Sequence, residues 1–537
     1  MARARGKRRD TEANAPVTVT EEAARPAEEP APSAPPPASP SWTQTAASWL
    51  GSAPTFLGAV FILLFLVVAV RRIRYPFALE WIEGGLLDEV RWLLAGHNLY
   101  VRPSVDFVPF IYNPLYFWVC AGASKVFGVS LFTLRLVSLA SSVGTLALLY
   151  KLVLEETESQ VAGVVGAGLY AATFKQTQQF MDVARVDALF VLLVVASLWA
   201  LRTRRTAPGQ AAAAALLVLC FLAKQSGMFV AAPLAGFVLW ERATAPGGGR
   251  LRGVPFAAAV LGGIGASAWL LDATSDGWYR YFAFELPRSH RLVSSLWTDF
   301  WTVDLMGPLG CACLGALFVL FGPGAMARRE RALWGAALAG VLLCSWSSRL
   351  HDGGWSNVLM PAYAVLSALF AIAFHEGLGL ARRATPDVRA RLEVFLPLAA
   401  TVQLAMMAYD PSHLVPTRRD EAAGWRVVSA LRGASGDTFT PTDSYLASLA
   451  GKRPHLHQMA VDDILRAPES EVGTRLVADL RGAFARKRWA MVITDNDFFA
   501  TEVLANYQRG ADSIGEADVF YPVTGVHYRP GWIYTPR

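Results

Sequence analysis

Charged residues are scarce in this chain of 537 residues. Asp, Glu, Lys and Arg make up 17% of it and hydrophobic residues 53%, whereas roughly a quarter of the residues in a soluble globular protein are charged. This composition excludes a soluble protein of this length and predicts a polytopic membrane protein. The net charge of +6 does not indicate nucleic-acid binding, because the basic residues form short clusters between apolar runs, where they set membrane topology.

Cysteine is also rare, and the usual metal and nucleotide motifs are missing. The five cysteines lie in or beside apolar runs without any Cys-x-x-Cys pair, so neither a disulfide framework nor a thiolate metal site is predicted. No His or Glu grouping has metal-ligand spacing; a divalent ion fits the chemistry proposed below but is not supported, and we predict no cofactor. The glycines of 247–249 and 262–265 indicate a linker and helix packing rather than a nucleotide site.

The first 45 residues differ from the rest of the chain. Residues 1–10 are basic and residues 11–40 are rich in Pro, Ala and Glu, so this segment cannot bury enough apolar surface to fold. The first apolar run begins only near Phe56, too far from the basic segment for a signal peptide. The sequence therefore predicts a disordered cytoplasmic tail over residues 1–45.

Eleven apolar runs follow, and we interpret them as transmembrane spans. They lie at about residues 56–70, 131–150, 161–174, 186–201, 211–223, 228–240, 254–271, 303–321, 333–346, 358–374 and 394–409. With the N-terminus in the cytoplasm, arginine clusters fall in four successive cytoplasmic loops, as the positive-inside rule requires. They are Arg202/Arg204/Arg205, Arg242/Arg250/Arg252, Arg328/Arg329/Arg331 and Arg382/Arg383/Arg389/Arg391. The cluster Arg71-Arg72-Ile73-Arg74 falls on the outer side and counts against this orientation, although it could bind anionic head groups there.

The same topology divides the chain into a membrane domain (46–410) and an outer domain (411–537). Its outward regions are 71–130, 175–187, 224–227, 272–302, 347–357 and everything from 410 onward. Helical periodicity over Leu86–Leu94 predicts a helix along the membrane interface in the first outer loop. The outer domain has soluble composition and a strand-like run at 489–494 after a helical stretch, which predicts a small α/β domain. The abundance of Ala, Arg and Gly indicates a bacterial source, and hence the inner membrane with a periplasmic C-terminal domain.

Two carboxylates stand where the first span meets water, in the segment Leu79-Glu80-Trp81-Ile82-Glu83-Gly84-Gly85. On a helical turn Glu80 and Glu83 would share one face. An acidic group at a membrane boundary is costly and is kept mostly for function, so we predict a catalytic role for this pair. Solvated interface carboxylates are the alternative.

Further polar residues occupy the other outward loops. Arg185 and Lys224 are candidates for binding a phosphate, and so are Arg288, His290 and Arg291, with ion pairing, snorkelling or a plain basic loop as alternatives. His351, Asp352 and Asn357 could bind a donor phosphate, a sugar or an ion, although Gly353-Gly354 beside them is also typical of a helix-capping turn.

Short elements between residues 75 and 240 resemble a known family in their order and spacing. They are Glu83-Gly84, Leu94-Ala95-Gly96, Tyr100, Tyr112-Asn113-Pro114-Leu115-Tyr116, Phe127-Gly128 and Arg135-Leu136. This order resembles the C-type superfamily of integral-membrane glycosyltransferases (GT-C), in particular the branch with protein O-mannosyltransferases, lipid A aminoarabinose transferases and family 39-like bacterial enzymes.

The resemblance implies a GT-C-like, all-α polytopic fold of about eleven transmembrane helices, followed by the small extracytoplasmic α/β domain. It assigns the general base to Glu83, with Glu80 second, and likens Asp187 to the acidic residue of the family's second outer loop. Tyr112 and Asn113 are assigned to substrate binding. The chain departs from the family at Ile82, where an Asp is expected.

Sugar transfer from a polyprenyl phosphate needs few groups. A base must activate the acceptor, and cations must neutralise the departing phosphate. The sequence thus predicts a polyprenyl-phosphate-dependent membrane glycosyltransferase whose acceptor is a glycolipid, a glycan or a protein. A polytopic transporter or a catalytically silent scaffold with an outer partner-binding domain are the alternatives; a transporter should show inverted repeats and charges at the bilayer midplane.

Overall fold

The computed structural model describes residues 16–18, 42–245, 249, 251–467, 470–495 and 497–537. The chain separates into two compact units, residues 1–46 and 47–537. Most of the predicted disordered tail lies outside the described residues. Its last four residues, 42–45, already belong to the first helix, α1 (Trp42–Arg72).

Each of the eleven predicted apolar runs coincides largely with a helix. After α1 these are α4 (Leu131–Thr157), α5 (Gln160–Ala172), α6 (Val186–Thr203), α7 (Ala207–Ala223), α8 (Gly227–Thr244), α9 (Val254–Ala273), α13 (Gly307–Phe321), α14 (Arg328–Arg349), α15 (Met360–Ala381) and α16 (Pro386–Ala405). By length and composition, six helical stretches of the described chain could cross a membrane: Trp49–Arg72, Leu131–Thr157, Val186–Thr203, Val254–Ala273, Leu296–Phe321 and Ser356–Ala381. The number of eleven spans therefore stays a prediction.

The helices pack through apolar faces and small residues. All residues of α15 from Met360 to Phe374 are buried, as expected of a helix that is apolar on every side and surrounded by others. A Cβ on Gly168 of α5 would lie 2.2 Å from the Cα of Gly58 in α1. Glycine at these positions lets the two helix backbones touch.

The first outer loop contains α2 (Glu83–Leu94) and α3 (Leu115–Phe127). The helix predicted at 86–94 is present as part of α2, and residues 83–90 are buried. Its predicted position along the membrane interface stays a prediction. A Cβ on Gly84 would lie 2.1 Å from the Tyr445 ring, and one on Gly85 would lie 2.6 Å from the Phe110 ring. The glycine pair at the start of α2 thus permits close contact with protein rather than with lipid.

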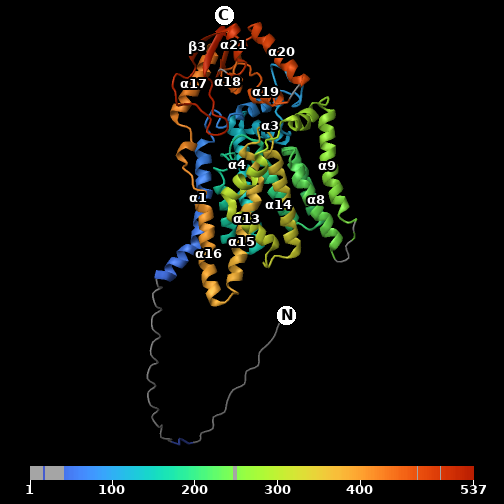
Figure 1. The fold of residues 1–537 in the computed structure, drawn as a ribbon, viewed down its shortest axis with the longest axis vertical. Helices are drawn as coiled ribbons and strands as arrows, with labels where there is room; N and C mark the ends of the chain where they lie inside the picture. Colours follow the sequence, from blue (N-terminus) through green and yellow to red (C-terminus); the bar gives the residue numbers. More distant parts are fainter. Residues whose placement is uncertain (1–15, 19–41, 246–248, 250, 468–469, 496) are drawn as a thin grey trace, which may run out of the picture. The chain divides into compact units, whose positions relative to one another are not determined.

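The C-terminal domain is built from helices around a small mixed sheet. Its elements are α17 (Arg418–Gly433), β1 (Thr438–Phe439), α18 (Tyr445–Leu449), α19 (Gln458–Leu465), α20 (Glu471–Ala485), β2 (Met491–Thr494), α21 (Ala500–Asn506), β3 (Tyr507–Asp512) and β4 (Trp532–Pro536). The strand order is β1-β2-β4-β3, with β1 and β2 parallel and the other pairs antiparallel. The strand predicted at 489–494 is β2. Within residues 47–537 this domain covers one end of the helices (Figure 1).

Candidate active site

A cavity of about 910 Å³ lies between the helices and the C-terminal domain. All six regions predicted to face outward contribute to its wall, which supports their placement at one end of the helices. Its polar and charged lining includes Glu80, Tyr112, Arg185, Lys224, Ser226, Arg288, His290, Arg349, His351, Asp352, Asn357, Asp463 and Arg466.

Glu83 is fully buried and does not line this cavity. Its Oε1 accepts hydrogen bonds from Arg135 Nε (2.9 Å) and Ala184 N (2.6 Å), and its Oε2 from Arg135 Nη2 (2.5 Å) and Leu79 N (2.6 Å). Burial alone would raise the pKa of Glu83, but the Arg135 guanidinium and these hydrogen bonds hold that pKa below its ordinary value. The expectation that Glu83 faces water is wrong, because this ionised group is solvated by protein donors instead.

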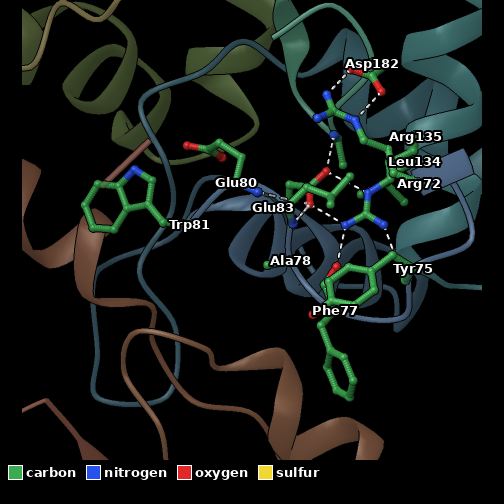
Figure 2. Close-up of polar contacts among 12 residues, drawn as sticks. Arg72, Tyr75, Phe77, Ala78, Glu80, Trp81, Glu83, Leu134, Arg135 and Asp182 are labelled. Carbon is green, nitrogen blue, oxygen red and sulfur yellow. Dashed lines mark hydrogen bonds and ion pairs between the residues drawn. The ribbon is translucent and has the colours of Figure 1, made fainter. Parts of the chain in front are cut away.

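Glu80 points away from Glu83 and lines the cavity (Figure 2). Residues 80–82 form a turn rather than a helix, so the two carboxylates do not share a face as expected. Glu80 Oε1 accepts from Arg185 Nη1 at 3.0 Å, and Oε2 accepts from Ile82 N at 3.1 Å. Burial raises the pKa of Glu80 to about 7, although Arg185 opposes this shift. Glu80 is thus a cavity-facing carboxylate that titrates near neutral pH.

Charges alternate along the start of α6 and the end of α7. Arg185 precedes α6 and donates from Nη2 to the Tyr112 hydroxyl (2.7 Å) as well as from Nη1 to Glu80. Lys224 Nζ lies 2.7 Å from Asp187 Oδ1, while Arg185 Nε is 4.0 Å from Asp187 Oδ2. Glu80, Arg185, Asp187 and Lys224 therefore form a chain of opposite charges in which Asp187 is buried behind the two cations.

The loops before η2 (Phe300–Met306) and after α14 meet at the cavity. Leu292 and His351 form an antiparallel bridge, and Asp352 N donates to Arg291 O at 2.8 Å. The cavity wall includes Arg288 and His290 but not Arg291, whose side chain is exposed.

The segment 351–357 is both a tight turn and part of the cavity wall, the two alternatives that its sequence left open. His351, Asp352 and Asn357 line the cavity, while Gly354 N donates to His351 O at 2.8 Å and Gly353 has a φ of +88°. The glycine pair therefore forms the tight turn that presents the three polar side chains.

Asn113 does not reach the cavity. Its Nδ2 donates to Phe221 O (2.5 Å), and its Oδ1 accepts from the Tyr279 hydroxyl (3.2 Å). The side chain is fully buried. Its amide ties the first outer loop to α7 and to the loop after α9, whereas Tyr112 beside it lines the cavity.

The sequence did not predict the ion pairs of two buried arginines near the site. Arg135 of α4 holds Glu83, and Arg72 at the end of α1 forms an ion pair with Asp182 at 2.5 Å (Figure 2). Arg72 also donates to Leu414 O. Arg72 is fully buried, so the idea that it binds lipid head groups is wrong. An arginine inside or at the end of an apolar run needs a buried partner, and this signal could have identified both.

Two further ion pairs border the cavity, and the sequence did not predict them either. Arg349 Nε contacts Asp304 Oδ2 at 2.8 Å, and Arg466 Nη1 contacts Asp463 Oδ1 at 2.7 Å. Among the described residues, no three His, Cys, Asp or Glu side chains are grouped so that they could hold a metal ion.

This chain is similar to known proteins in part of its sequence and in its fold. Residues 109–261 match the family model of dolichyl-phosphate-mannose-protein mannosyltransferases. None of the curated proteins has a matching sequence. The predicted resemblance to the GT-C glycosyltransferases is confirmed by the family match and by similar solved structures.

The first of these is ArnT from Cupriavidus metallidurans bound to undecaprenyl phosphate (TM-score 0.58, 12% identity, covering 89% of this chain and 97% of that one). The apo state of ArnT is also similar (TM-score 0.56, 13% identity, covering 91% of this chain and 98% of that one). A third is the archaeal oligosaccharyltransferase AglB from Archaeoglobus fulgidus in complex with an inhibitory peptide and a dolichol-phosphate (TM-score 0.51, 12% identity, covering 85% of this chain and 70% of that one). At these identities the likeness is one of fold.

Proposed function

We propose that this chain is a membrane glycosyltransferase that transfers a sugar from a polyprenyl-phosphate donor to an acceptor, with Glu80 as the general base. The observation that carries this proposal is a cavity-facing carboxylate that titrates near pH 7, beside two cations in a cavity large enough for a sugar phosphate. Similar folds bound to undecaprenyl phosphate and to a dolichol-phosphate support the donor class.

In the proposed reaction an acceptor hydroxyl or amine attacks the anomeric carbon of the donor sugar. Glu80 takes the acceptor's proton, the bond between the anomeric carbon and the phosphate oxygen breaks, and the polyprenyl phosphate leaves with the bonding electrons. Arg185 and Lys224 neutralise the charge that develops on this phosphate, assisted by Arg288 and Arg349 at the cavity wall.

The cavity also offers an apolar surface for a lipid chain. Val293, Leu296, Trp297 and Trp346 line it, and Trp297 is 48% exposed. The cavity wall thus carries both charged and apolar groups, as an isoprenoid phosphate requires. In this proposal Glu83, the base assigned from the resemblance, instead holds the turn that carries Glu80.

Transfer of radiolabelled sugar from a polyprenyl phosphate in proteoliposomes tests the proposal. Glu80→Gln removes the base and should lower transfer by about 100-fold or more. Wild-type transfer should also fall below about pH 7, as Glu80 becomes protonated, and Glu80→Gln should lose this dependence. Glu89→Gln is the matched control, because Glu89 is a buried carboxylate of α2 whose pKa burial raises to about 8 and which does not line the cavity.

The control variant should transfer sugar at the wild-type rate. Wild-type transfer by Glu80→Gln would remove Glu80 from the chemistry. An absence of transfer by the wild-type chain, with every polyprenyl-phosphate sugar supplied, would favour the transporter or the scaffold.

A further inference from the structure

The backbone that carries Glu80 is held by two different parts of the chain. We call residues 78–83 the acidic turn. Because the turn is irregular, most of its buried backbone groups need partners outside it. Arg135 of α4 donates to Phe77 O just before the turn (2.5 Å), and Leu86 N of α2 donates to Ile82 O at its end (3.1 Å).

The carbonyls on either side of Glu80 are held by the C-terminal domain instead. Leu79 O accepts from Val523 N (2.8 Å) and Thr524 N (3.1 Å), and Glu80 forms a parallel β-bridge with Thr524. Trp81 O lies 3.2 Å from the Tyr528 hydroxyl, which also lies 3.0 Å from Thr442 O and from Asp443 Oδ1. The carbonyls of Leu79 and Trp81 are therefore both contacted by residues more than 400 positions away in the chain.

A second contact to Trp81 O comes from a histidine with one defined tautomer. His457 Nδ1 accepts from Met459 N (3.1 Å), so the ring proton is on Nε2, which donates to Trp81 O (3.2 Å). Burial lowers the pKa of His457 to about 4, which keeps the ring neutral at physiological pH. Trp81 O thus has a permanent donor.

Gly525 lies directly against the Glu80 carboxylate. Its φ is +84°, and a Cβ there would lie 3.1 Å from Glu80 Oε1 and 2.7 Å from Trp81 Cδ1. The neighbouring Thr524 donates from Oγ1 to Gln178 O (2.5 Å), in the loop that leads to Arg185. The segment from Val523 to Tyr528 therefore contacts Glu80 itself, its backbone and the loop of its cationic partner.

We propose that Val523–Tyr528 is a positioning element of the active site, which sets the direction of the Glu80 carboxylate in the cavity. This inference rests on the proposed function of Glu80. It makes the C-terminal domain part of the catalytic centre.

Gly525→Ala and Gly515→Ala form a matched pair for the test, made in the full-length chain. Both glycines have positive φ, +84° and +75°, so alanine strains the backbone similarly. Only the Gly525 methyl group meets Glu80, since nothing lies within 4 Å of a Cβ at Gly515. Gly525→Ala should lower kcat on the order of 100-fold, the effect of a misplaced catalytic group, and shift the pH at which transfer falls, with KM for the donor unchanged.

Tyr528→Phe provides a second variant in case Gly525→Ala folds poorly. It removes the hydroxyl beside Trp81 O but keeps the ring, and it should lower kcat without raising KM. Its control is Tyr507→Phe, which removes a buried hydroxyl that contacts Trp489 N within the same domain. Both control variants should keep the wild-type kcat and pH profile.

The outcomes separate this inference from the proposed function. If Glu80→Gln is inactive while the Gly525 and Tyr528 variants match their controls in kcat and pH profile, the positioning role is refuted. Glu80 then keeps its proposed role as the general base. If Glu80→Gln transfers sugar normally, the proposed base fails and the positioning role fails with it.

Discussion

At the scale of single residues, two buried carboxylates three positions apart, each paired with an arginine, differ in the hydrogen bonds that they accept. Glu83 has four hydrogen bonds at 2.9 Å or less, two of them from one guanidinium. Glu80 has two, at 3.0 and 3.1 Å. A buried carboxylate stays ionised only when donors replace the water it has lost. Glu83 therefore remains charged and structural, whereas Glu80 can gain and lose a proton near pH 7.

Glu83→Gln should destabilise the fold rather than act on the chemistry directly. The substitution leaves the Arg135 guanidinium buried without a countercharge, and breaking such a pair costs about 3–5 kcal/mol. Thermal unfolding in detergent should show a clear loss of stability. Glu285→Gln is the control, because its ion pair with Arg280 is more than half exposed and is worth about 1 kcal/mol or less. An unchanged melting temperature with abolished transfer would return Glu83 to a catalytic role.

At the scale of elements, the site is assembled from helix ends. Arg185 precedes the first residue of α6, Lys224 follows the last residue of α7, and the acidic turn leads into α2. Helix ends place polar groups at fixed positions next to apolar segments, so the charges meet at one level of the bundle. The C-terminal domain covers α2 with its helix α18. Ser444, just before α18, donates to Asp88 of α2 at 2.6 Å across this contact.

Gly84→Ala should loosen the contact between α2 and the C-terminal domain. A Cβ would lie 2.1 Å from Cδ1 and 2.9 Å from Cγ of Tyr445, a buried ring that cannot move aside. We expect faster proteolytic release of the C-terminal domain and weaker transfer. Gly122→Ala in α3 is the control, because nothing lies within 4 Å of its Cβ and alanine is the better helix former. Equal proteolysis of the two variants would show that the contact tolerates the methyl group.

At the scale of the whole molecule, charge gathers at both ends of the helices. The end opposite the cavity carries ion pairs between Arg202 and Glu156 (2.6 Å), between Arg205 and Glu330 (3.1 Å), and between Arg329 and Glu241. These arginines belong to the clusters that the positive-inside rule assigns to the cytoplasm. We therefore propose that the cavity and the C-terminal domain face the periplasm.

Labelling with a membrane-impermeant thiol reagent tests this orientation. In a chain whose five native cysteines are replaced, Arg486→Cys in the C-terminal domain should react in intact spheroplasts. Arg383→Cys, after α15, should react only once the membrane is permeabilised, and both positions are exposed in the structure. Labelling in the opposite sense would move the proposed site to the cytoplasm.

The sequence by itself determined the features that depend on local composition. Low charge and apolar runs identified a membrane protein, each run lies largely in a helix, and the run at 489–494 contains β2. The resemblance between residues 75 and 240 identified the type of fold. Outward loops chosen from topology all reach one cavity, because helices that cross a bundle return their alternate ends to the same side.

Only the tertiary structure decided which carboxylate faces the cavity and what holds it there. Glu83 is paired with a residue 52 positions away, and Trp81 is bonded by one 447 positions away. Neither periodicity nor spacing records such contacts. In a buried site the ionisation of an acid depends on the donors that packing brings to it. The distant donors to Glu83 and Glu80 come from α4 and the loop before α6, and the C-terminal domain contacts the backbone on either side of Glu80.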